Sequence, residues 1–123
     1  MSKSALFFLL LLANTVSAAD WKVDNSREFI HNGTLTIRQV DGHYKITFPD
    51  QSILRSGSIV VDGDILYVNE PNGFSGIYGD RIIKRLLSAQ KAVAIYDDRY
   101  KTKSSQEVID LPDLKLKLKQ LKK

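Results

Sequence analysis

The chain lacks cysteine and contains few residues that would bind a metal. Its 123 residues include no cysteine and only two histidines, His31 and His43. Without cysteine no disulfide can form, so the fold must be stabilised by packing alone, which favours a bacterial periplasm over a harsher extracellular setting. Two histidines without a third placed ligand do not make a zinc site. We therefore predict no metal and no cofactor.

Long apolar runs are absent after the first eighteen residues. The run at 5–13 follows Lys3 and precedes the small residues at 16–18, which is the pattern of a secretory signal peptide. The run is shorter than the roughly 20 residues that a membrane span needs, although an uncleaved anchor is the alternative. No cysteine follows it for lipid attachment. We predict cleavage after Ala18 or Ala19 and a periplasmic or secreted protein.

Net positive charge is scarce outside the C-terminal segment. The formal net charge is +4, but residues 113–123 contain five lysines against one aspartate. The rest of the mature chain is therefore close to neutral. A nucleic-acid-binding domain carries its basic patch on the folded body, so we expect no nucleic-acid partner.

Turn-forming pairs are frequent in the mature chain before residue 74. Asn-Gly or Asp-Gly pairs occur at 32–33, 41–42, 62–63 and 72–73. These pairs favour tight hairpins, because both central residues of a type I′ turn have positive φ. Between the turns, apolar and polar residues alternate, and one strand is expected over 53–61 with a bulge at Gly57.

Two further strands are expected after residue 91. The apolar run at 92–96 indicates a buried strand, and 107–109 would pair with it through a charged loop. Together with the earlier strands, the sequence predicts a mainly antiparallel β-meander of six or seven strands.

One amphipathic helix is predicted from Asp80 to Lys91. Its apolar positions at three-and-four spacing are Ile82, Ile83, Leu86 and Leu87. Asp80 is expected as the N-cap, where a carboxylate accepts hydrogen bonds from free backbone N–H groups. A helix with an apolar stripe needs a sheet to bury it, so the fold class is α+β. We expect a single domain over 19–112 and a basic tail over 113–123.

The tail combines leucine with lysine. Positions 114–119 alternate with period two, which indicates a strand, but the leucines also have helical spacing and Pro112 suits a first helical turn. We predict a short basic amphipathic helix. It would bind an acidic partner or an anionic membrane, or pack its leucines on the body and leave its lysines in solvent. Its candidate contact residues are Lys115, Lys117, Lys119, Lys122 and Lys123.

The glycine-rich segment before the predicted helix carries two aromatic residues. Phe74 and Tyr78 are expected to form an exposed patch, and exposed apolar patches mark contact sites. We predict that they contact a partner.

No set of acid, base and nucleophile converges in the sequence. The segment 73–76 approaches the G-x-S-x-G motif of serine hydrolases, but Ile77 replaces the final glycine and both histidines precede Ser75. We therefore predict no catalytic residues. A small hydrolase is the third hypothesis, and its candidate residues are Ser75, His31, His43, Asp62 and Asp97.

From residue 80 onward the hydrophobic pattern resembles the invasion-associated protein B family of secreted bacterial proteins. The matching residues lie at 82–87, 93–96 and 111–118, although that family usually has cysteines before its helix and this chain has none. The resemblance implies a cell-envelope protein and assigns no catalytic residues.

These observations favour a non-enzymatic protein that binds another envelope or secreted protein. The alternative is a peripheral membrane-binding protein that uses its lysine-rich tail.

Overall fold

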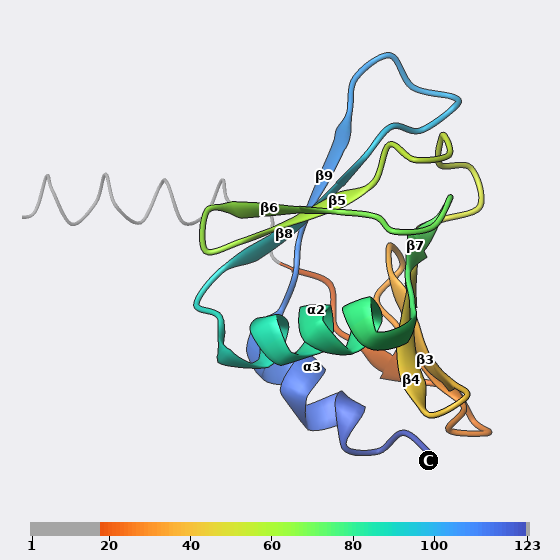
Figure 1. The fold of residues 1–123 in the computed structure, drawn as a ribbon, viewed down its shortest axis with the longest axis vertical. Helices are drawn as coiled ribbons and strands as arrows, with labels where there is room; N and C mark the ends of the chain where they lie inside the picture. Colours follow the sequence, from red (N-terminus) through yellow and green to blue (C-terminus); the bar gives the residue numbers. More distant parts are fainter. Residues whose placement is uncertain (1–17, 123) are drawn as a thin grey trace, which may run out of the picture.

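The computed structural model describes residues 18–122 and contains two antiparallel sheets and two helices (Figure 1). The predicted signal peptide, up to residue 17, and Lys123 lie outside the described residues. The α+β class and the antiparallel meander are confirmed. The described chain has nine strands in two sheets, where six or seven strands were expected.

The elements follow one another along the chain with short connections. The strands are β1 (Lys22–Val23), β2 (Phe29–His31), β3 (Thr36–Val40), β4 (His43–Thr47), β5 (Ser58–Val61), β6 (Asp64–Tyr67), β7 (Gly73–Phe74), β8 (Ala92–Tyr96) and β9 (Ser105–Val108). The helices are α2 (Gly76–Ser88) and α3 (Leu111–Leu118).

The first sheet has the strand order β1-β2-β3-β4-β7. Asp41 and Gly42 join β3 to β4, and both have positive φ, as the type I′ turn predicted from this pair requires. β7 returns to pair with β4 through Ile46 and Phe74. Gly73 is needed there, because a Cβ at this position would overlap the carbonyl oxygen of Ile46.

The second sheet has the order β6-β5-β8-β9. The turn at 62–63 joins β5 to β6, and β8 and β9 form the predicted hairpin. The strand predicted over 53–61 begins only at Ser58, so that expectation is wrong in its first half. Gly57 is buried against the ring of Phe48, and the segment before it forms a loop held by hydrogen bonds to residues 97 and 99.

The helix α2 connects the two sheets. It begins four residues before the predicted start, because the N-cap is Ser75, whose backbone is extended, and not Asp80. It ends three residues before the predicted end, with Ala89 as its C-cap. The expectation that Asp80 caps the helix is therefore wrong. Asp80 instead lies within the helix, and its carboxylate accepts a hydrogen bond from the backbone N–H of Tyr44 in β4.

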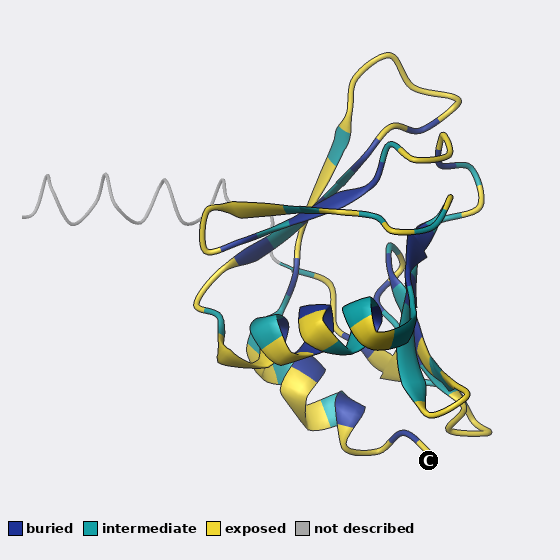
Figure 2. Ribbon diagram, viewed as in Figure 1, coloured by how far each residue is buried: buried dark blue, intermediate teal, exposed yellow. Residues whose placement is uncertain are grey.

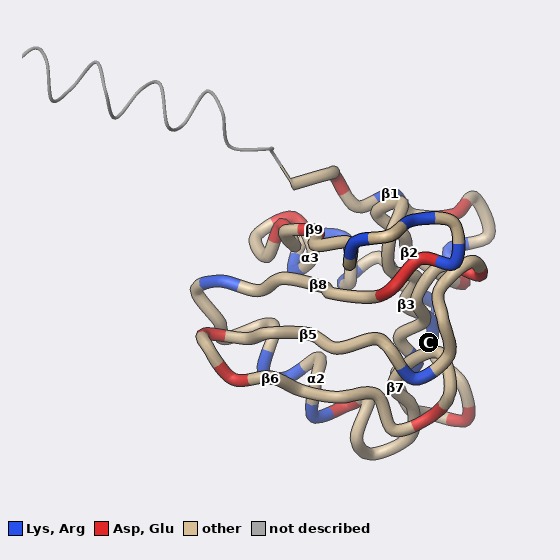
Figure 3. Tube along the Cα trace, turned by 90° about the horizontal axis from the view of Figure 1, so that it is seen from above, with Lys and Arg blue, Asp and Glu red and all other residues tan. Residues whose placement is uncertain are grey.

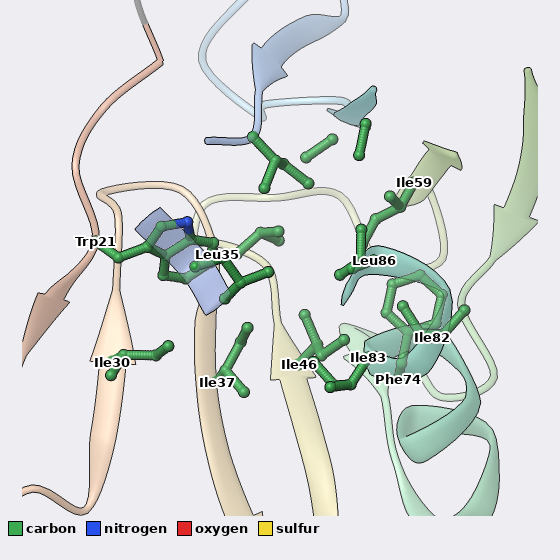
Figure 4. Packing of buried hydrophobic residues seen from close by; sticks show 14 of the residues in the cluster. Trp21, Ile30, Leu35, Ile37, Ile46, Ile59, Phe74, Ile82, Ile83 and Leu86 are labelled. Carbon is green, nitrogen blue, oxygen red and sulfur yellow. The ribbon is translucent and has the colours of Figure 1, made fainter. Parts of the chain in front are cut away.

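The core lies between the two sheets and α2 (Figure 4). The helix contributes Ile82, Ile83 and Leu86, which are buried and face residues of both sheets in Figure 4, and Figure 2 shows both buried and exposed positions along α2. The largest fully buried side chains are Trp21, Ile30, Leu35, Ile37, Ile46, Ile59, Val61, Phe74, Ile82, Leu86 and Leu114. One cluster of buried residues thus joins both sheets into one unit.

The C-terminal segment is a helix, as predicted, and it packs against α2 and bonds to Trp21 before β1. Leu114, Leu118 and Leu121 are buried in the same core cluster. Asp110 caps α3 by accepting a hydrogen bond from the backbone N–H of Asp113. These three leucines of the predicted basic tail therefore pack on the body, one of the two arrangements expected for this segment.

Within residues 18–122, neither helix has the length and apolar character needed to cross a membrane.

Candidate functional site

The closest acid–base pair in the described chain joins β4 to α2. The Nδ1 atom of His43 lies 2.6 Å from Oδ2 of Asp80, whose other oxygen accepts a 2.7 Å hydrogen bond from the backbone N–H of Tyr44. The bonds from His43 and Tyr44, in that order of effect, lower the pKa of Asp80 below its ordinary value. Beside them, Gly79 packs directly on the carbonyl of Tyr44. These contacts hold the helix on the sheet and include no nucleophile.

The other residues considered for a hydrolase do not converge. Ser75 is an N-cap whose side chain makes no capping bond, and its backbone pairs with the side chain of Asn69. His31 pairs in register with Thr36 at the start of β3, whereas His43 lies opposite the last residue of that strand. Over residues 18–122, no group of three His, Cys, Asp or Glu side chains is placed to hold a metal ion.

The two acidic candidates have local structural contacts. Asp62 accepts hydrogen bonds from the backbone N–H groups of Gln90 and Lys91, which closes the connection between α2 and β8. Asp97 accepts a 2.5 Å hydrogen bond from the hydroxyl of Ser104 in the β8–β9 loop. Each carboxylate thus fixes a turn.

The predicted exposed aromatic patch is not present as expected. Phe74 is fully buried, so its expected exposure is wrong: β7 places it among Ile46, Phe48 and Tyr78 in the core. Tyr78 is half-buried and lies beside Leu66 at the edge of the second sheet. The sequence suggested a loose lead into the helix, but the segment is a strand followed by the first turn of α2.

The lysines of the C-terminal segment differ in their surroundings. The ammonium group of Lys117 is partly buried and donates to the backbone carbonyl of Trp21, 2.9 Å away, and to Asp113. The pKa of Asp113 is lowered mainly by the N–H of Trp21 and further by Lys117. Lys115, Lys119 and Lys122 are exposed. Lys123 lies outside the described residues.

The outward face of the first sheet carries an open polar groove of about 650 Å³. Its cations, Arg38 and Lys45, lie directly opposite each other on β3 and β4. Both have other contacts: the guanidinium of Arg38 stacks 5.1 Å from the ring centre of Phe29, and Lys45 lies 3.6 Å from Glu70. The polar outward face follows from the alternation of these two strands.

The outward face of the second sheet is apolar, which is unusual for a face that no described element covers. The registers of the four strands place Ile65, Val60, Val93 and Val108 in one continuous row. In the next row, Tyr67 and Ile95 flank Ser58. The side chains at both edges are well exposed, at 52% for Ile65, 66% for Tyr67 and 40% for Val108. We call these two rows the outer face; its aliphatic and aromatic members are Val60, Ile65, Tyr67, Val93, Ile95 and Val108.

The sequence contained a signal for this face that we interpreted differently. The uninterrupted apolar run at 92–96 predicted a strand buried on both sides. In the structure Ala92, Ala94 and Tyr96 point into the core, while Val93 and Ile95 remain partly exposed on the other side. An apolar strand with a covering layer on only one side leaves a surface suited to contact.

A groove of about 400 Å³ lies between the edge strand β6 and the helix α2. Leu66, on the inward side of β6, meets Tyr78 and Ile82 of the helix to form its apolar floor. Figures 1 and 3 both show α2 beneath the β6 side of the second sheet. We call it the β6–α2 groove; its remaining lining residues are Arg81, Lys84, Arg85 and Ser88.

The rim of the β6–α2 groove is basic (Figure 3). Arg85 donates a 3.0 Å hydrogen bond to Asp64 and so links the helix to the start of β6. Arg81 and Lys84 are exposed and form no ion pair with any residue between 18 and 122. The groove therefore combines an apolar floor with two free positive charges.

Comparison with known proteins finds no family model, curated protein or solved structure that matches the chain. The resemblance to the invasion-associated protein B family stays a prediction.

Proposed function

We propose that this chain is a small secreted, non-enzymatic protein that binds another protein of the bacterial envelope through its outer face. The observation that carries the proposal is the exposed row of Ile65, Val60, Val93 and Val108 across all four strands of the second sheet. Secretion is supported by the signal-peptide pattern over residues 1–18.

The dimensions of the outer face suit the centre of a protein interface. Four strands about 4.8 Å apart span about 14 Å, and the two rows together form one continuous patch. Protein interfaces combine such an apolar centre with a polar rim. Asp62 and Lys91 form a polar margin at one end of the face, and Gln106 adds a polar group in its second row.

An apolar surface without neighbouring cations in its rows favours a protein partner over a lipid bilayer. Binding to a bilayer surface needs apolar residues next to cations. In α3 the leucines that would insert into lipid are buried, except Leu116, which is 57% exposed. The membrane-binding alternative therefore rests on Leu116 with Lys115 and Lys119, a smaller surface than the outer face.

The test is covalent cross-linking in the native envelope followed by recovery of the tagged protein. The variant Ile65→Lys/Val108→Lys adds two charges at exposed positions of the outer face, where binding would bury them unpaired. The matched control Leu54→Lys/Leu116→Lys adds the same charges at exposed apolar positions elsewhere. Circular dichroism and thermal unfolding establish that both variants are folded.

We expect one dominant protein to be cross-linked by the wild-type chain and by the control, and lost with the outer-face variant. Equal recovery by all three proteins, or recovery of lipid alone, would overturn the proposal. Sedimentation of the purified chain supplies a further outcome. A wild-type dimer that becomes a monomer with Ile65→Lys/Val108→Lys would show that a second copy, and no other protein, covers the face.

A further inference from the structure

The β6–α2 groove lies at a free edge of the second sheet. β6 pairs with β5 on one side, and no strand within residues 18–122 pairs with its other side. Edge strands present backbone N–H and C=O groups that another extended chain can use. β6 carries no proline or lysine, and its one charged side chain, Asp64, is bonded to Arg85, so the backbone from Ile65 to Tyr67 has no blocking side chain beside it.

The groove supplies contacts for the side chains of an added strand. Residues of an added strand alternate between the two faces of the sheet, as in any β-strand. On the inward face they would meet the floor of Leu66, Tyr78 and Ile82. On the outward face they would extend the row that ends at Ile65. The edge therefore provides backbone pairing, an apolar pocket on one side and an apolar row on the other.

The charged residues beside the groove indicate the charge of the ligand. Arg81 and Lys84 project from the exposed side of α2 beside the groove, and neither has a carboxylate partner among the described residues. The neighbouring carboxylates are occupied: Asp64 bonds to Arg85, and Asp80 bonds to His43 and Tyr44. An added chain with acidic side chains would pair with these two cations, whereas a basic chain would be repelled.

We propose that β6 binds an extended acidic peptide segment of a partner as an additional antiparallel strand, with its apolar side chains in the β6–α2 groove and its carboxylates near Arg81 and Lys84. This mode uses main-chain hydrogen bonds for affinity and side-chain pockets for specificity. The inference rests on the proposed protein-binding function and names the chemistry of the partner. It places the peptide site beside the outer face. The folded part of the same partner would cover the outer face.

The test uses a defined probe in place of the unidentified partner. The probe is a fluorescent seven-residue peptide, blocked at both ends, with valine at its five central positions and glutamate at each end, so that valines line both faces of the added strand and both glutamates lie on the groove side. Its binding is measured by anisotropy and by chemical-shift changes of the amides of residues 64–68. Two comparison peptides have lysine in place of glutamate or a central N-methylated residue.

Two variants of the protein distinguish the effect of the charge at the groove rim from the effect of the overall charge of the protein. Arg81→Glu/Lys84→Glu reverses the two rim cations. Lys115→Glu/Lys119→Glu makes the same charge change at exposed positions of α3, away from the groove. Thermal unfolding of both variants confirms that they are folded before binding is measured.

We expect the valine–glutamate peptide to bind the wild type and the α3 variant equally and to lose at least tenfold in affinity with Arg81→Glu/Lys84→Glu. The lysine peptide and the N-methylated peptide should bind at least tenfold more weakly to the wild type. Three results would overturn the inference. They are equal affinity of the valine–glutamate peptide for the wild type and Arg81→Glu/Lys84→Glu, equal affinity of the N-methylated and unmodified peptides, or chemical-shift changes only at amides outside residues 64–68.

Failure of this inference differs from failure of the proposed function. If the native partner is lost with Val108→Lys alone, which changes β9 and leaves β6 intact, but is retained with Arg81→Glu/Lys84→Glu, the outer face binds the partner and the groove does not bind its peptide. If the peptide binds as expected and no partner is cross-linked, the groove is a peptide site and the outer-face proposal is wrong.

Discussion

Replacing Gly79 by alanine should destabilise the protein, although the same change in most helices stabilises it. An alanine in a helix interior is favoured over glycine by about 1 kcal/mol. At Gly79, however, the added Cβ would overlap the carbonyl oxygen of Tyr44 and lie 3.2 Å from its carbonyl carbon. The atom that it meets belongs to the backbone of β4, so no side chain can rotate away.

The magnitude follows from these opposing terms. Overpacking costs about 1–3 kcal/mol, and contact with fixed backbone places Gly79 near the upper end of that range. After subtracting the gain in helix propensity, we expect the free energy of unfolding to fall by about 1–2 kcal/mol. For a domain of this size, that corresponds to a drop in the midpoint of thermal unfolding of about 5–15 °C.

The assay is thermal and urea unfolding of the mature protein, followed by circular dichroism. Ser88→Ala is the matched control, because Ser88 is an exposed residue at the end of the same helix and should gain slightly in stability. If Gly79→Ala unfolds at the same temperature as the wild type or higher, the close approach of α2 to β4 described here is refuted.

Three further variants test the contacts of α2 and α3. Asp80→Asn removes a carboxylate whose pKa is lowered by His43 and Tyr44; that stabilisation is fully present above about pH 4 and is lost as the pH falls through the folded pKa. The variant should therefore be less stable at pH 7 and lose less stability between pH 5 and pH 3, as measured by urea unfolding; an unchanged pH dependence would contradict this. Leu114→Ala should cost about 2–5 kcal/mol because Leu114 is fully buried, whereas Leu116→Ala, at an exposed position of the same helix, should change stability by less than about 0.5 kcal/mol. Equal effects of the two leucine variants would show that α3 does not pack on the body.

Local sequence signals predicted most of the secondary structure because the turns of this chain are chemically explicit. Asp41 and Asp62, each followed by glycine, adopt the positive φ values on which the hairpin prediction depended. The prediction was weaker where long-range contacts decide the structure. Nothing near Asp80 in the sequence indicates that its carboxylate bonds to Tyr44, 36 positions earlier, so its position after a glycine suggested a cap.

The candidate site was missed because it depends on how many layers cover a strand. Alternation along β3 and β4 correctly indicated one polar face, since one residue in two is polar there. The run at 92–96 has no polar residue, and its composition is the same whether its second face is covered or exposed. Only the arrangement of α2 on one side of the second sheet, with no described element on the other, distinguishes the two cases.

The helix α2 connects the stability of the fold to the proposed peptide site. Its buried side fills the core, Gly79 and Asp80 fix it to β4, and its exposed cations form the rim of the β6–α2 groove. A change that lifts the helix from β4 should therefore move Arg81 and Lys84 relative to β6 while leaving the β5–β8 pairing of the outer face in place. Below its unfolding temperature, Gly79→Ala should thus weaken binding of the valine–glutamate peptide and leave cross-linking through the outer face unchanged, and an equal loss of both would show that the two surfaces act as one site.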